Sequence, residues 1–202
     1  MNKFTCITIA IGEKYIHEAN RLKLSFPDLH IFTQHNPLYK PFGNSDLFDA
    51  LCHKSNFAAY LPENVTGPIF LMDADLYSDI ENPLERFTIE PDVDFAFVPY
   101  SGMWFFPDTP RQNAINILNG KINSGFLYFK NIDIARDISA QWCEMCHKRM
   151  SLSLWEYDEY SLMIIIANSE YKWKHLDGIW NDWGENNGFD PNPNSILKQK
   201  HI

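Results

Sequence analysis

The chain has 202 residues, of which 45% are hydrophobic, and a formal net charge of −9. This length and composition fit one globular domain with a substantial core, and an acidic chain without a Lys/Arg cluster disfavours nucleic-acid binding. No segment approaches the roughly 18 apolar residues of a membrane-spanning helix, and no signal-peptide pattern opens the sequence, so we expect a cytoplasmic protein.

Predicted strands and helices alternate along the chain. Apolar and β-branched runs predict the strands, and apolar residues at three- and four-residue spacing predict the helices. In chain order these are a strand (4–11), a helix (15–26), a strand (30–33), a helix (47–61), strands (68–72, 95–99 and 123–129), helices (132–149 and 157–167) and a strand (171–175). This order predicts an α/β fold with a largely parallel central sheet flanked by helices. We expect one domain over residues 1–185 and a C-terminal tail over residues 186–202.

Ligands of such sheets bind beyond the carboxyl ends of the strands. Asp73 and Asp75 directly follow the buried run Ile-Phe-Leu-Met, and in extended chain residues two apart project to one side. Two carboxylates placed so can share one hard cation, whereas without a cation they repel. The alternative interpretation is a helix cap beside a surface carboxylate.

A histidine also follows a predicted strand. His175 ends the strand over 171–175 and precedes a Gly turn. Imidazole is a usual third ligand beside carboxylates for manganese-like ions, although an isolated histidine is more often a polar loop residue. The sequence thus predicts a Mn²⁺ or Mg²⁺ site formed by Asp73, Asp75 and His175.

Five blocks of the chain, in order, resemble the GT-A glycosyltransferases, and specifically glycosyltransferase family 8, which includes glycogenin. The most specific is Phe-Leu-Met-Asp-Ala-Asp-Leu, which is similar to the Asp-Ala-Asp signature of that family. The blocks are residues 8–15, 70–76, 123–129 (Asn-Ser-Gly and the strand after it), 157–162 (with Asp158-Glu159) and 175–178 (His-Leu-Asp-Gly, followed by Trp183).

The resemblance implies a GT-A fold, a uridine diphosphate sugar donor and roles for individual residues. It implies nucleotide or sugar contacts at Ala10, Ile11, Tyr15, Asp73, Asn123, Ser124, Gly125 and Gly178. It places Asp158 and Glu159 at the catalytic centre. The alternative interpretation of Tyr15 is packing on a helix face.

Two positions depart from the family pattern. Asn181 stands where the family has a diphosphate-binding Lys, and Lys54, upstream of the acidic pair, is a candidate replacement. Glu159 stands where the family has Gln, and a carboxylate there can act as a nucleophile or as a general base. This second departure leaves open whether the anomeric configuration is retained.

The sequence as a whole predicts a metal-dependent glycosyltransferase that moves a sugar from a nucleoside diphosphate donor to a hydroxyl acceptor. The acceptor can be a glycan, a protein or, less favoured by the acidic charge, modified nucleic acid. The alternative is a non-catalytic nucleotide-sugar-binding domain of the same fold, which the Lys-to-Asn departure motivates. A phosphatase with a similar acidic motif is disfavoured, because Tyr77 occupies the position of its usual Thr or Val.

Overall fold

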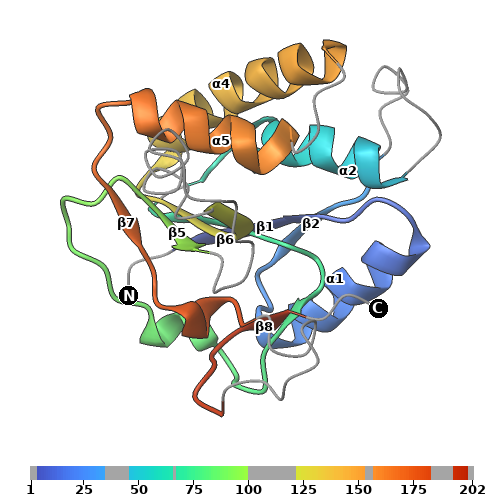
Figure 1. The fold of residues 1–202 in the computed structure, drawn as a ribbon. Coiled ribbons are helices and arrows are strands. Elements are labelled where there is room, and N and C mark those ends of the chain that lie inside the picture. Colours follow the sequence, from blue (N-terminus) through green and yellow to red (C-terminus); the bar gives the residue numbers. More distant parts are fainter. Residues whose placement is uncertain are drawn as a thin grey trace, which may run out of the picture.

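The computed structural model describes residues 4–34, 46–65, 67–99, 122–152, 157–182 and 193–199. A six-stranded sheet in the order β2-β1-β3-β6-β5-β7 forms its centre (Figure 1). The strands are β1 Thr5–Ile9, β2 His30–Phe32, β3 Ile69–Met72, β5 Phe95–Pro99, β6 Ile122–Phe129 and β7 Trp173–His175. In this sheet β6 runs antiparallel to both of its neighbours, and the other pairs are parallel. The predicted α/β class with a mostly parallel sheet is confirmed.

Helices cover both faces of the sheet (Figure 1). One face carries α1, and the other carries α2, α4 and α5. Their bounds are α1 Glu13–Ser25, α2 Asp46–Ser55, α4 Ile132–Ser151 and α5 Tyr157–Asn168, with short 3₁₀ helices η2 Phe57–Tyr60, η3 Pro83–Arg86 and η4 Gly178–Trp180. The single helix predicted over 47–61 is divided at Asn56 into α2 and η2. In the described part of the chain no helix combines the length and apolar character needed to span a bilayer.

The alternation of side chains along each strand explains the two apolar layers. In β3, Ile69 and Leu71 join the cluster beneath α2, α4 and α5, whereas Phe70 and Met72 join the cluster on the α1 side. All four residues are buried, which is why the sequence shows a continuous apolar run rather than alternation. The strand that leads to the acidic pair is therefore held rigidly on both faces.

A small second sheet lies beside the first on the α1 side. It pairs β4 (Leu76–Tyr77) with β8 (Lys198–Gln199) in antiparallel register, and neither strand was predicted. Just before β8, Ile196 and Leu197 are buried in the core cluster. The predicted tail over 186–202 therefore does not hold for residues 195–199, which pack as part of the domain. A two-residue strand is too short to give a periodic signal.

Candidate functional site

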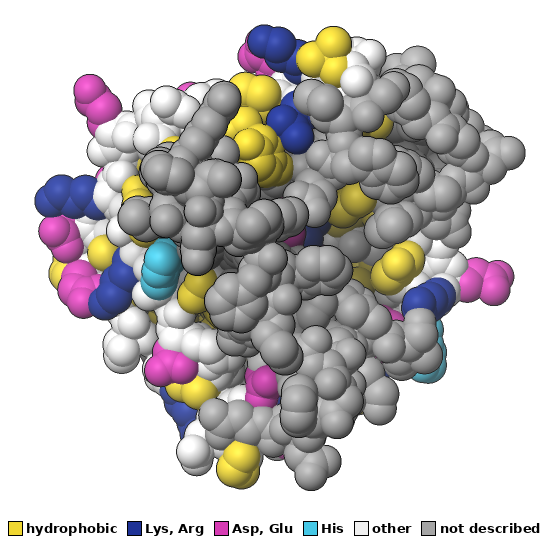
Figure 2. All heavy atoms as spheres, in the orientation of Figure 1, with side chains coloured by type: hydrophobic (Ala, Val, Ile, Leu, Met, Phe, Trp, Pro, Cys, Tyr) yellow, Lys and Arg dark blue, Asp and Glu magenta, His cyan; other side chains and the backbone are white. Residues whose placement is uncertain are grey.

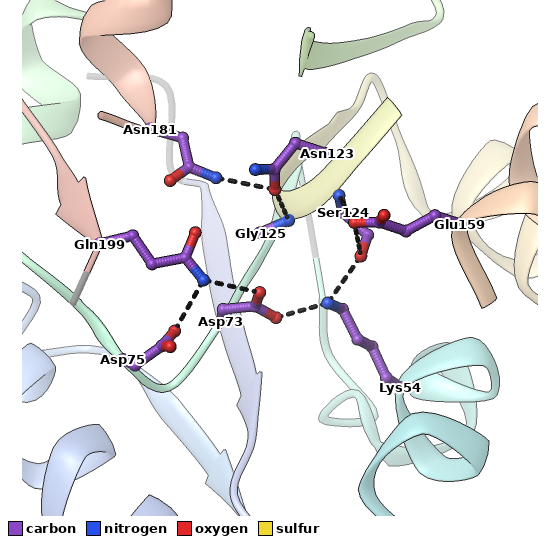
Figure 3. Close-up of polar contacts among 9 residues, drawn as sticks. All are labelled: Lys54, Asp73, Asp75, Asn123, Ser124, Gly125, Glu159, Asn181 and Gln199. Carbon is purple, nitrogen blue, oxygen red and sulfur yellow. Dashed lines mark hydrogen bonds and ion pairs between the residues drawn. The ribbon is translucent and has the colours of Figure 1, made fainter. Parts of the chain in front are cut away.

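The acidic pair lies at the carboxyl end of β3. The Asp73 amide donates to the Gly125 carbonyl at 2.8 Å, and the Leu76 amide donates to the Asp73 carbonyl at 3.3 Å. The second bond closes a turn, so a turn brings the carboxylates together rather than the extended chain that the sequence suggested. Their convergence is nevertheless clear, because Gln199 Nε2 contacts both, at 3.3 Å from Asp73 Oδ2 and 3.0 Å from Asp75 Oδ1 (Figure 3).

A buried lysine neutralises part of this acidic charge. Lys54, in the last turn of α2, donates to Asp73 Oδ1 at 2.5 Å and to Ser124 Oγ at 2.8 Å. Burial alone lowers the pKa of the ammonium, but the nearby carboxylates of Asp73, Asp158 and Glu159 outweigh it, and the pKa is raised overall. Lys54 thus places a positive charge beside the acidic pair.

The first turn of α5 contributes two acids. Ser124 donates to Glu159 Oε1 from both its amide, at 2.9 Å, and its hydroxyl, at 3.0 Å. The backbone carbonyl of Asp158 accepts from Trp142 Nε1 at 2.6 Å, which fixes the start of α5 against α4. Burial raises the pKa of the Asp158 carboxyl, and Lys54 opposes this effect. A continuous set of contacts therefore runs from the acidic pair through Lys54 and Ser124 to Glu159 (Figure 3).

Gly125 allows the side chains above β6 to close around the site. A Cβ there would lie 2.5 Å from Asn181 Nδ2, 2.8 Å from Asn123 Oδ1 and 3.1 Å from Asp73 Oδ2. Asn123 Oδ1 accepts from the Gly125 amide at 2.7 Å and from Asn181 Nδ2 at 2.9 Å. The remaining amide atoms, Asn123 Nδ2 and Asn181 Oδ1, are buried and lack a hydrogen-bond partner among the described residues. Such atoms are normally paired in folded proteins, so they indicate a place where a polar ligand binds.

Replacing Gly125 with Ala is expected to destabilise the fold by about 1–3 kcal/mol, because the added Cβ would overpack against Asn181 and Asn123. A urea denaturation curve and the thermal midpoint would measure this loss. Gly178→Ala is the matched control, since a Cβ at Gly178 would meet nothing within 4 Å. A Gly125→Ala protein as stable as the wild type would contradict the close packing of these side chains around Gly125.

Of the residues predicted to contact the nucleotide, Ala10 and Tyr15 lie next to the acidic pair. Ala10 and Ile11 follow β1 and are fully buried. Ala10 packs with Ala19 and with Ala74, the residue between the two aspartates, and Tyr15 is half-buried against this cluster. The blocks over residues 8–15 and 70–76 are thus neighbours in space. The Tyr15 ring is partly exposed at the edge of the site.

The predicted third metal ligand is not brought to the pair. His175 ends β7, which is separated from β3 by β6 and β5, a distance of about 14 Å at roughly 4.8 Å per strand. Its ring packs at 4.8 Å from the Phe97 ring, and partial burial lowers the pKa of the imidazole. No group of three or more His, Cys, Asp and Glu side chains able to hold a metal is found within the described residues. The structure also gives no close approach at Gly178, which is exposed.

Sequence reasoning missed one residue at the centre of the site. Gln199 lies within the predicted tail, and its contact with Asp75 joins positions 124 residues apart. No local pattern marks such a residue. Asn181 was noted only as a departure from a family pattern, and its buried contact with Asn123 was not predicted.

Charged side chains of both signs are interspersed over the described part of the face seen in Figure 2. Several form exposed pairs, such as Lys172 with Asp92 and Lys174 with Glu90. No basic stripe is visible among the described residues on this face.

Comparisons with known proteins identify the fold. No family model matches the chain, and no curated protein matches it. The similar solved structures include three glycosyltransferases. The first is a glycosyltransferase involved in glycosylation of the major capsid of PBCV-1 (12% identity, TM-score 0.61, 97% of this chain and 91% of that one). The second is the glycosyltransferase GlyE of Streptococcus pneumoniae TIGR4 (11%, TM-score 0.62, 99% of this chain but only 55% of that one). The third is the galactosyltransferase LgtC in complex with donor and acceptor sugar analogs (11%, TM-score 0.59, 98% and 87%). The chain therefore has the GT-A glycosyltransferase fold.

Proposed function

We propose that the chain is a metal-dependent glycosyltransferase that moves a sugar from a nucleoside diphosphate donor, preferably a uridine diphosphate sugar, to a hydroxyl acceptor. The observation that carries the proposal is a continuous set of contacts. Gln199 joins Asp75 to Asp73, and Lys54 and Ser124 join Asp73 to Glu159. This set lies at the carboxyl edge of the sheet, where ligands of α/β folds bind. The likeness in fold to LgtC, solved with donor and acceptor sugar analogs, supports it.

The acidic pair fits a hard divalent cation. Mn²⁺ and Mg²⁺ prefer oxygen ligands, and the carboxylates of Asp73 and Asp75 converge on one point, marked by Gln199 Nε2. When bound, such a cation stabilises the negative charge that develops on a departing diphosphate.

The other side chains of the site suit the donor. Tyr15, which packs beside Ala10, offers a flat apolar surface to a nucleobase. Lys54 adds positive charge towards the diphosphate or the sugar. The unpartnered atoms Asn123 Nδ2 and Asn181 Oδ1 supply one donor and one acceptor for sugar hydroxyls.

Glu159 is the residue that we assign to the reacting carbon. Two hydrogen bonds from Ser124 fix one of its carboxylate oxygens, so its negative charge is held in a set position. Departure of the diphosphate leaves positive charge on the sugar, and a fixed carboxylate stabilises that charge, attacks the carbon or removes the acceptor proton. Asp158, on the preceding position, orients the sugar.

Glu159→Gln is expected to lower the transfer rate by about 10²–10⁴-fold, the usual contribution of a catalytic carboxylate. The Gln carbonyl oxygen can still accept both bonds from Ser124, so donor affinity should stay close to that of the wild type. Steady-state rates and a separate titration of donor distinguish the two quantities. A variant with the wild-type rate would remove Glu159 from the mechanism.

The proposal is tested by incubating the purified chain with a panel of nucleotide sugars and Mn²⁺, first without an acceptor and then with hydroxyl acceptors. We expect slow release of uridine diphosphate that stops when the metal is chelated, and faster release with the correct acceptor. Binding of donor without any release, over the whole panel and with every acceptor, would favour a non-catalytic nucleotide-sugar-binding domain.

A further inference from the structure

We propose that Gln199 is an oxygen ligand of the bound cation, supplied by the C-terminal strand β8. This inference rests on the metal-dependent function proposed above and identifies the partner of the two aspartates. The Gln199 carboxamide lies between both carboxylates, 3.3 Å from Asp73 Oδ2 and 3.0 Å from Asp75 Oδ1 (Figure 3). A cation shared by the two carboxylates therefore has to contact this side chain or displace it.

The backbone holds Gln199 in place. Its amide donates to the Asp182 carbonyl at 2.8 Å, and β8 pairs it with Leu76, the residue directly after Asp75. Leu197, two positions earlier, is fully buried. These contacts fix the backbone of Gln199 beside the acidic pair, so we expect its side chain to remain within reach of the cation.

The Gln199 carboxamide can make favourable contacts both without and with a bound cation. Without metal, its N–H groups donate to the two carboxylates and offset their mutual repulsion. A half-turn about the terminal side-chain torsion, which has a broad energy profile, exchanges Nε2 for Oε1. The carbonyl oxygen then faces the cation, and carboxamide oxygens are ordinary ligands of hard divalent ions.

An independent observation indicates that a ligand belongs here. Asn123 Nδ2 and Asn181 Oδ1 are buried beside the pair and have no partner among the described residues. Both asparagines are at most 2% exposed. Around Gly125 their side chains come together with Asp73 Oδ2. These atoms can hydrogen-bond to water or to groups of the nucleotide-sugar donor that complete the coordination shell of the cation.

The inference predicts protein ligands that are all oxygen. Asp73, Asp75 and Gln199 would coordinate through oxygen, and His175 ends β7, which lies three strand spacings, about 14 Å, from β3. Pulsed electron paramagnetic resonance of bound Mn²⁺ detects a directly coordinated imidazole nitrogen. We expect none in the wild type and a clear nitrogen coupling in Gln199→His, where an imidazole is placed at the same position.

The affinity for Mn²⁺, measured without nucleotide, shows whether Gln199 is a ligand of the cation or competes with it. Gln199→Met keeps the length of the side chain but removes the oxygen, and we expect it to weaken Mn²⁺ binding by about tenfold or more, as loss of a metal-site residue typically does. Gln199→Glu, which adds a charged oxygen, should tighten it. Gln141→Met is the matched control, because Gln141 is an exposed residue of α4 that bonds Asp137.

Three results would overturn the inference. The first is a Gln199→Met protein that is folded, as its thermal midpoint shows, and binds Mn²⁺ at least as tightly as the wild type. Gln199 is then a bystander or a competitor of the cation. An imidazole coupling in the wild type that disappears in His175→Ala assigns the ligand to His175 instead. In both cases the metal-dependent function stands if Asp75→Asn abolishes Mn²⁺ binding, whereas a wild type that binds no Mn²⁺ overturns both proposals.

Discussion

Replacing Asp75 with Asn is expected to lower kcat/KM for donor turnover by about 10³-fold, since metal stabilisation of a leaving group is worth several kcal/mol. The Asn side chain nearly matches Asp in shape and can still accept a hydrogen bond from Gln199 Nε2, which contacts Asp75 at 3.0 Å. The loss should therefore come from the missing charge, and the free energy of unfolding should change little. Initial rates over a Mn²⁺ titration and a urea denaturation curve measure the two quantities.

Asp79→Asn is the matched control for this prediction. Asp79 is a nearby acid whose side chain is 70% exposed and pairs with Lys198. Because the Asp79 carboxylate is mostly exposed, its pair with Lys198 contributes little, so turnover should be unaffected. Equal losses in the two variants, or full activity in Asp75→Asn, would contradict the role given to the acidic pair.

Replacing Lys54 with Met should destabilise the fold and also reduce turnover. The Lys54 side chain is only 9% exposed and its partner Asp73 is 25% exposed. Removing one member of a buried pair leaves the other charge uncompensated, for which we expect about 2–3 kcal/mol of lost stability after allowing for the partial exposure of Asp73. Urea denaturation provides the measurement.

A double variant tests the cause of that loss. If an uncompensated charge is responsible, adding Asp73→Asn to Lys54→Met should recover most of the lost stability. Lys172→Met is a suitable control, because Lys172 and Asp92 form a pair in which both side chains are mostly exposed. A Lys54→Met protein as stable as the wild type would mean that the Lys54–Asp73 contact is not a structural element.

The fold was predictable because local patterns determine most of its elements. Continuous apolar runs gave the buried strands, and the position of Asp73 and Asp75 after β3 followed from the run over 69–72. Helical spacing gave α4 and α5, and so placed Glu159 in the first turn of a helix. The prediction of Lys54 at the site came from its position upstream of that strand.

The unpredicted features depend on contacts between distant positions. β4 and β8 have two residues each, and their pairing joins Leu76 to Gln199. Likewise, the sequence places His175 at the same sheet edge as the acidic pair, but only the strand order shows that two strands lie between them. Spacing along the chain gives the edge of the sheet on which a residue lies, and the strand order decides which side chains meet.

The most direct test of the metal-dependent donor site is isothermal titration of uridine diphosphate into the wild type and into Asp75→Ala, with and without Mn²⁺. We expect binding only to the wild type and only when Mn²⁺ is present. Absence of binding under every condition, or equal binding without the metal, would contradict the proposal that Asp73 and Asp75 hold a cation for a nucleoside diphosphate donor.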